Sequence, residues 1–239
     1  MRALAIAAAA AALLGAAAAF AQAPAAPVPV PAPDSMAQRM QACTSCHGKE
    51  GRSTPSGYFP RIAGKPAGYL YNQLVAFRDG RRSNAAMTYL LQHLPDDYLQ
   101  EIATHFAGRE LPYAAAPAGN ASPQALERGA ALILHGDARR AVPACVQCHG
   151  ERMTGVEPGV PGLLGLPRDY LVAQLGAWRT GQRKAAAPDC MAQIAGRLDA
   201  EDIGAVAAWL ASRTPPADAR PAAVPPAARP PLDCGSAWR

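Results

Sequence analysis

Large apolar and charged side chains are scarce in this sequence. Of its 239 residues, 6% are aromatic and 17% are charged, and much of the 50% hydrophobic content is alanine. Beyond the N-terminal leader no run of about 18 apolar residues occurs, so we expect no membrane-spanning helix in the mature chain. The formal net charge of +5 is scattered, mostly as arginine, without the basic stripe and interleaved aromatics of a nucleic-acid surface. We therefore expect no nucleic-acid partner and peripheral membrane contact at most.

Residues 1–21 are predicted to be a secretory signal peptide. Arg2 precedes an uninterrupted apolar run, and Ala19-Phe20-Ala21 supplies small residues at the cleavage spacing, leaving Gln22 as the new N-terminus. A membrane anchor is the alternative, but no stop-transfer charges follow the run. Export predicts a soluble protein of the periplasm, an oxidising compartment in which disulfides form.

The chain repeats itself at an offset of about 101 to 104 residues. "CTSCHG" at 43–48 recurs as "CVQCHG" at 145–150, and the segment 59–82 recurs as 160–183. We therefore predict a duplicated domain. The predicted parts are the signal peptide 1–21, a Pro/Ala-rich linker 22–34, an N-terminal domain 35–113, a linker 114–121, a C-terminal domain 122–213 and a Pro-rich tail 214–239.

Both domains are predicted to be all-α. Ser122-Pro123 is an N-cap followed by proline at the first helical position, and Asp199 with Asp202 resembles a capping box. No segment alternates convincingly with the two-residue period of a strand. One helix face is predicted from residues spaced by three or four positions, all of them apolar or aromatic except Gln73: Tyr69, Leu70, Gln73, Leu74 and Phe77. Domains this small with so few large apolar side chains have little core of their own, which suggests that a cofactor completes each one.

The repeated Cys-x-x-Cys-His motif is the attachment sequence of c-type haem. Two thiols form thioethers with the haem vinyl groups, and the adjacent imidazole is held where it can bind the iron. The sequence lacks the second ligand pair of a zinc site and the βαβ context of a thioredoxin-like dithiol. We therefore predict two covalently bound haem c groups. They would be held by Cys43, Cys46 and His47 in the first motif and by Cys145, Cys148 and His149 in the second.

A methionine follows each motif at a matching distance. Met87 lies 40 residues after His47, and Met191 lies 42 residues after His149. Thioether sulfur is a soft ligand for haem iron, so we predict His/Met ligation of both irons. The remaining candidates have no counterpart in the other repeat and are interpreted as packing or surface residues: Met36, Met40, Met153, His93, His105 and His135.

This arrangement resembles class I cytochrome c, and two such units behind a signal peptide resemble the di-haem cytochrome c4 family. The resemblance covers residues 36–213 and excludes the Pro-rich termini. It implies that the carbonyl groups of Pro60 and Pro161 accept hydrogen bonds from the two motif histidines, orienting their rings. It also implies a haem environment that includes four repeat-matched residues: Tyr69, Tyr170, Arg82 and Arg183.

Two cysteines remain outside the motifs. Cys190 and Cys234 are expected to form a disulfide that ties the tail to the loop carrying Met191. The alternative is a Cys190 thiolate bound to iron, which would lower the reduction potential. The tail around Trp238 is expected to cover the second domain, with a docking element as the alternative.

The predicted function is one-electron transfer. An iron with six ligands leaves no position for a substrate. The resemblance implies delivery of electrons from a quinol-oxidising complex or a periplasmic dehydrogenase to a terminal oxidase. Two alternatives remain open: a di-haem enzyme of the thiosulfate dehydrogenase or peroxidase type, and the cytochrome subunit of a periplasmic dehydrogenase complex.

Overall fold

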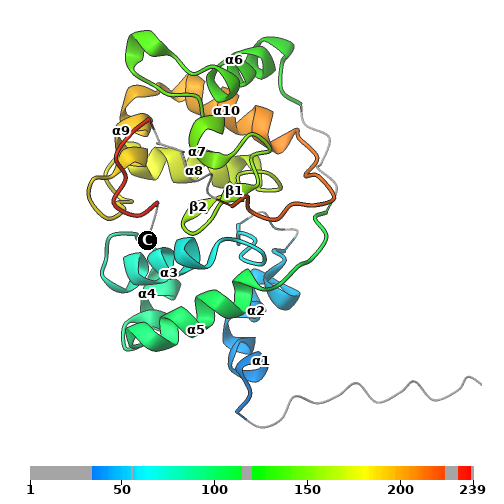
Figure 1. The fold of residues 1–239 in the computed structure, drawn as a ribbon, viewed down its shortest axis with the longest axis vertical. Coiled ribbons are helices and arrows are strands. Elements are labelled where there is room, and N and C mark those ends of the chain that lie inside the picture. The colour runs from blue at the N-terminus through cyan, green and yellow to red at the C-terminus, as the bar shows by residue number, and fades with distance from the viewer. Residues whose placement is uncertain (1–33, 55, 57, 115–119, 224–230, 238–239) are drawn as a thin grey trace, which may run out of the picture.

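The regular secondary structure is almost entirely helical in the computed structural model, which describes residues 34–54, 56, 58–114, 120–223 and 231–237. The predicted signal peptide and almost all of the Pro/Ala-rich linker lie outside the described residues, as does Trp238. The helices form two groups that follow one another along the chain (Figure 1). Within the described residues, no helix has the length and apolar character needed to cross a membrane.

The first half of the molecule holds five α-helices and one 3-10 turn among its described residues. These elements are α1 (Met36–Arg39), α2 (Gln41–His47), η1 (Lys49–Gly51), α3 (Ala67–Arg78), α4 (Ala85–Leu91) and α5 (Asp96–Ala107). Helix α3 packs against α5, and the core between them includes Leu70, Phe77, Leu99, Ile102 and Phe106.

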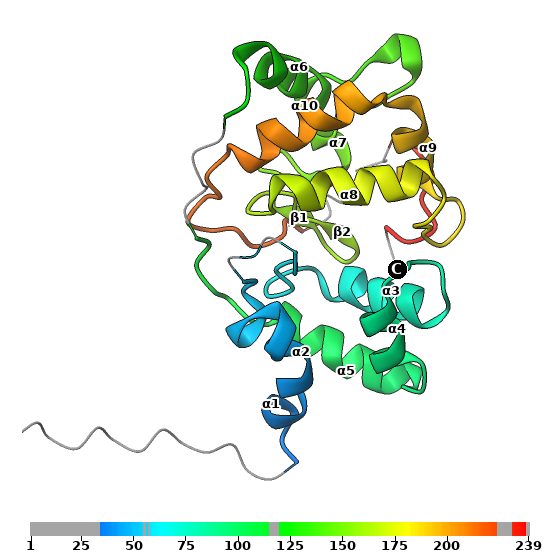
Figure 2. The ribbon, with the colours of Figure 1, turned by 180° about the vertical axis from the view of Figure 1, so that it is seen from behind.

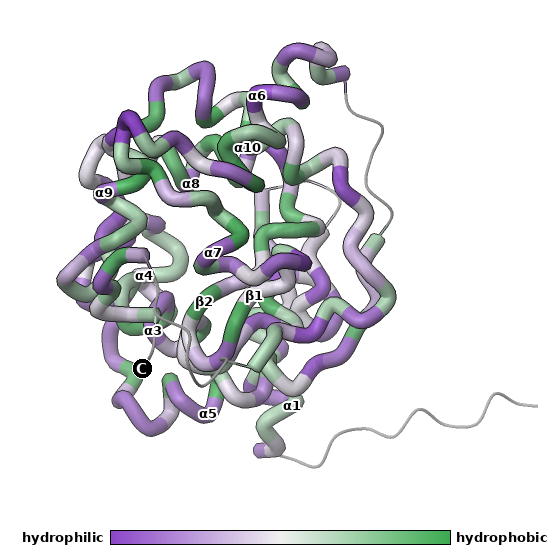
Figure 3. The backbone as a smooth tube through the Cα atoms, turned by 45° about the horizontal axis from the view of Figure 1, so that its top comes forward, coloured by the Kyte–Doolittle hydropathy of each residue, from purple (hydrophilic) through white to green (hydrophobic). Residues whose placement is uncertain are grey.

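The second half repeats the order of the five α-helices, with a 3-10 turn at a different place and two short strands added. Its described elements are α6 (Pro123–Leu134), η2 (Ala138–Arg140), α7 (Val146–His149), β1 (Gly155–Val156), β2 (Val160–Pro161), α8 (Arg168–Arg179), α9 (Cys190–Arg197) and α10 (Ala200–Ala211). The antiparallel β1–β2 pair was not predicted, because two-residue strands are too short to show an alternating pattern. Apolar stretches gather in β1, β2 and α10 (Figure 3).

The long helix α6 and the C-terminal helix α10 cross closely in the second half. Gly129 permits this, since a Cβ atom there would lie 2.9 Å from the Cβ of Trp209 and would overlap the Ala205 backbone. The predicted caps are confirmed: Ser122 accepts a hydrogen bond from the backbone of Ala125, and Asp199 forms a capping box with Asp202.

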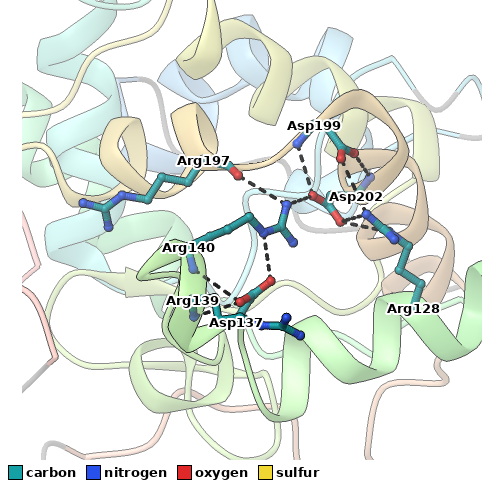
Figure 4. Close-up of polar contacts among 7 residues, drawn as sticks. All are labelled: Arg128, Asp137, Arg139, Arg140, Arg197, Asp199 and Asp202. Atoms are coloured by element: carbon teal, nitrogen blue, oxygen red, sulfur yellow. Dashed lines mark hydrogen bonds and ion pairs between the residues drawn. The ribbon is translucent and has the colours of Figure 1, made fainter.

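Asp202 is also the centre of an ion-pair network at this crossing. Its side chain is fully buried, and it accepts hydrogen bonds from Arg128 of α6 and Arg140 of η2 (Figure 4). Burial opposes ionisation, but the bonds from Arg140 and the Asp199 backbone and the arginine charges together hold the pKa of Asp202 below its usual range. The repeat places Tyr98 at the matching position of α5, where Arg39 lies 5.7 Å from the ring centroid.

Helices α3 and α8, which were predicted from the repeated Tyr-Leu-Gln-Leu pattern, lie on the two sides of the junction between the halves (Figures 1 and 2). Just after these helices, Arg82 and Arg183 form an isolated antiparallel bridge. The Lys184 amide donates to the Arg81 carbonyl at 2.7 Å. The repeated segments therefore face each other across the interface.

Candidate functional site

The first Cys-x-x-Cys-His motif lies on α2, and His47 is the last residue of that helix. Gly48 follows with φ +78°, and a Cβ there would overlap the carbonyl of Ser53, so this turn requires glycine. The Nδ1–H of His47 donates to the Pro60 carbonyl at 2.9 Å, since a carbonyl can only accept. Burial lowers the pKa of His47, although the Pro60 bond opposes this. The imidazole is thus neutral, with its Nε2 lone pair available to a metal.

The second motif has the same geometry on α7. His149 ends the helix, and its Nδ1–H donates to the Pro161 carbonyl at 2.7 Å. Burial lowers the pKa of His149 as well, and the Lys65 charge adds to this effect. Pro60 and Pro161 therefore stand where the resemblance placed them, and each orients one ring.

The motif thiols lie beside their histidines in partly apolar surroundings. Within the described residues, none of the four takes part in a disulfide. Burial raises the pKa of Cys43 and of Cys148, and it raises that of Cys145 to about 11. Across the described part of the chain, no group of three or more His, Cys, Asp or Glu residues could hold a metal ion.

One continuous cavity of about 1070 Å³ joins both motifs. Its walls include the cysteines and histidines of both motifs together with Met87 and Met191. Among the five histidines of the chain, only His47 and His149 line it. This volume is close to the upper limit for a single small-molecule site, which is about 1,000 Å³.

Each methionine sits in the first turn of a short capped helix. The Asn84 side chain accepts a hydrogen bond from the Met87 amide at 3.1 Å, which starts α4. The Asp189 side chain accepts from the Ala192 amide at 3.0 Å, which starts α9 just before Met191. Capping fixes where these helices begin and therefore where each thioether enters the cavity.

Tyr69, Tyr170, Arg82 and Arg183 line the cavity, as the haem environment was expected to do, but they also join the two halves. Arg82 donates to the Tyr170 hydroxyl at 2.9 Å and to Gln174 at 2.7 Å. Arg183 makes the mirror-image contacts, with Gln73 at 2.7 Å and the Tyr69 hydroxyl at 3.5 Å. Each arginine therefore binds side chains of the opposite half.

Three buried cations at this junction have no carboxylate partner among the described residues: Lys65, Arg82 and Arg183. The Lys65 ammonium of the first half donates to the Gly162 carbonyl of the second at 2.8 Å. Burial and the nearby Arg61 charge lower the pKa of Lys65 to about 7. Buried cations without anions are costly, so this junction suits an anionic group from the cavity.

These features fit two haem groups. Each half offers two thiols for thioether bonds, a neutral imidazole, a thioether sulfur and apolar walls, and the junction offers unpaired cations to haem propionates. Sequence reasoning missed Lys65, because its counterpart in the repeat is Leu166 and symmetry gave no signal. It noted Gln73 only as part of a helix pattern.

Cys190 and Cys234 are joined in a disulfide, with their Cα atoms 5.3 Å apart. The bond crosses 44 residues of sequence and attaches the tail to the first residue of α9. A cysteine in a disulfide carries no thiolate, which argues against Cys190 as an iron ligand. The expected pairing is the one that the structure shows.

Comparison with known proteins gives a consistent picture. Residues 126–214 match the family model of cytochrome c. The thiosulfate dehydrogenase electron acceptor of Thiomonas intermedia is 36% identical over 172 residues, which cover 72% of this chain and 78% of that protein. Cytochrome c4 of Pseudomonas aeruginosa is 34% identical over 70% of this chain and 82% of its own length.

Solved structures agree with these relatives. Reduced cytochrome c4 from Pseudomonas stutzeri superposes with a TM-score of 0.63 at 29% identity, covering 74% of this chain and 95% of that one. With relatives matched over most of their length, the chain belongs to the di-haem cytochrome c4 family and carries two covalently bound haem c groups.

Proposed function

We propose that this chain is an exported one-electron carrier whose two irons are each held between a histidine and a methionine. His47 and Met87 would bind the first iron, and His149 and Met191 the second. The cysteine pairs Cys43/Cys46 and Cys145/Cys148 would anchor the two haem groups.

One observation carries this proposal: each half places one neutral imidazole and one thioether on the walls of the same apolar cavity. His/Met ligation saturates the iron and raises its reduction potential. The bound groups supply reversible one-electron chemistry. The chain contributes apolar walls, whose burial of each imidazole favours its neutral form, and carbonyl groups that orient each ring through a hydrogen bond.

We further propose that the donor is a periplasmic dehydrogenase and that a terminal oxidase is the final acceptor. Similarity to proteins named as electron acceptors of thiosulfate dehydrogenase, at 36% and 37% identity, makes that enzyme the first donor to test. The chain would then be the cytochrome partner of the dehydrogenase, and thiosulfate oxidation itself would belong to the donor.

Ligand substitution combined with a redox titration tests the carrier. Replacing Met87 or Met191 by alanine should change the visible and electron paramagnetic resonance spectra of one haem each. The potential of that haem should fall by about 100 mV, a modest part of the 0.8 V range that axial ligands span. An unchanged spectrum in either variant would contradict the assignment.

The donor is tested separately. Reduction of the oxidised holoprotein should follow addition of thiosulfate dehydrogenase with thiosulfate, and neither component alone should suffice. Turnover of thiosulfate or peroxide by the chain alone would instead favour the catalytic alternative.

A further inference from the structure

The cavity opens differently in the two halves. Among the exposed residues of the first half that line the cavity are Tyr58, Ala86 and Leu90, and we call these three the first mouth. Tyr58 is 65% exposed and Leu90 is 45% exposed. The repeat matches them to Gly159, Cys190 and Ile194, which we call the second mouth.

The second mouth is covered by the C-terminal strap, residues 231–237. Cys190 is bonded to Cys234 of the strap, and Ile194 is half-buried against the core of the second half. At Gly159, a Cβ atom would lie 2.7 Å from the carbonyl oxygens of both Ser236 and Ala237. The strap backbone thus lies where a side chain at position 159, the counterpart of Tyr58 in the repeat, would begin.

The strap is held at several points besides the disulfide. The Gly235 amide donates to the Pro188 carbonyl at 2.9 Å, and the Asn72 side chain of α3 donates to the Ser236 carbonyl at 3.0 Å. Cys234 and Ala237 are buried against Val156 and Val160 in a small apolar cluster. The strap therefore forms part of the cavity wall and contacts both halves. In Figure 1 it runs beside α9.

The first mouth is apolar and uncharged. Of the four large hydrophobic side chains that are exposed in the described residues, three lie at this mouth or beside it on α4: Tyr58, Tyr89 and Leu90. Residues 83–95, which contain α4, include no Asp, Glu, Lys or Arg. Apolar side chains gathered at one exposed place mark an interaction surface.

We propose that the strap closes the second mouth, so that redox proteins exchange electrons with this chain only at the first mouth. This inference rests on the proposed carrier function. The partner that docks at the first mouth is a protein whose own redox centre is exposed through an uncharged, apolar rim. The reason is that the first mouth has no charged side chain that could form an ion pair with a charged partner. In each encounter the donor loses one electron and this chain gains one, and that electron reaches the second half across the Arg82–Arg183 junction.

Solvent access to the two haem groups tests the strap without any partner. A neutral gadolinium chelate added to the oxidised holoprotein should broaden the haem methyl resonances of the first half and spare those of the second. In the double variant Cys190→Ala, Cys234→Ser, both sets should broaden. Equal broadening in the unmodified protein, or continued protection in the double variant, would overturn the proposal.

Matched charge substitutions test the docking surface. Tyr89 and Gln193 are exposed at equivalent positions of α4 and α9. With thiosulfate dehydrogenase and thiosulfate as the reductant, Tyr89→Glu should slow the bimolecular reduction about tenfold, as expected for losing one good interface contact. Gln193→Glu should leave the rate unchanged, and both variants should keep the haem spectra.

The outcomes separate the two proposals. Equal slowing by both substitutions, or slowing by Gln193→Glu alone, would overturn the single docking surface. If the unmodified protein is not reduced at all, the donor assignment fails, and the gadolinium experiment still decides whether the strap closes the second mouth.

Discussion

The two halves of this molecule share a motif, a helix order and a methionine that lines the cavity, but they differ in what surrounds these features. The first half has a four-residue α1, an exposed mouth and a tyrosine at position 98. The second half has a twelve-residue α6 crossed closely by α10, the buried Asp202 network and a covalently attached strap. Duplication thus preserved what binds the cofactor, whereas the support around it diverged.

The buried cations at the junction are also distributed unevenly between the two halves. Lys65 and Arg61 belong to the loop of the first half, and the repeat aligns them with Leu166 and Gly162. Arg61 donates to the carbonyls of Ala63, Leu111 and Pro112, and it stacks 3.9 Å from the ring centroid of Tyr113. Lys65 instead reaches into the second half. The two haem groups therefore have different electrostatic surroundings, and we expect unequal reduction potentials.

Removing the disulfide should have the largest effect on stability. The double variant Cys190→Ala, Cys234→Ser opens a loop of 44 residues. The chain-entropy model gives about 4 kcal/mol for such a loop, all of it in the second half. Denaturant unfolding, followed through the spectrum of each haem, should show an earlier midpoint for the second half only. An equal shift of both midpoints would mean that the strap stabilises the whole molecule.

Replacing Asp202 by alanine should have the second-largest effect on stability. The change removes the capping box of α10 and the partner of Arg128 and Arg140, for a loss of about 3 kcal/mol. Tyr98→Ala in the first half serves as the matched control: it should leave the stability of the second half unchanged. A loss below 1 kcal/mol for the Asp202 variant would show that the network contributes little.

The same carboxylate predicts a pH dependence. Because the pKa of Asp202 is lowered by folding, its contribution is present above the ordinary carboxylate pKa of about 4 and is lost as pH falls through the folded value. Acid titration should therefore destabilise the second half before the first. In Asp202→Asn this difference between the halves should shrink.

Adding a methyl group against the strap should have a smaller effect on stability. Gly159→Ala places a methyl group 2.7 Å from two strap carbonyls, which can shift at a cost of about 1 kcal/mol. Hydrogen exchange of the strap amides should speed up. Tyr58→Ala, at the matching position of the first half, should leave those amides unchanged.

Ionic strength should have the smallest effect. The first mouth is uncharged, so the rate of reduction by a protein donor should change little between low and physiological salt. A steep fall in that rate with added salt would place docking on an arginine-rich surface, and the first mouth would no longer distinguish the halves.

Several features could be predicted because they depend on local sequence. The helix from Ala67 to Arg78, the cap at Ser122 and the capping box at Asp199 follow from spacing and side-chain chemistry within a few residues. The repeat also aligned Met87 with Met191. The partners of Tyr69 and Arg82 could not be predicted, because they belong to the opposite half and lie about a hundred residues away.

By itself, the sequence determined the cofactor chemistry, the duplication and the helical class, since two Cys-x-x-Cys-His motifs and their repeated flanks are patterns of neighbouring residues. Only the tertiary structure decided that both motifs open into one cavity, that cations without carboxylate partners meet between the halves, and that the strap lies over Gly159. Those features depend on the packing of one half against the other. Side-chain burial and charge pairing across that junction arise from contacts between distant segments, and no local pattern encodes them.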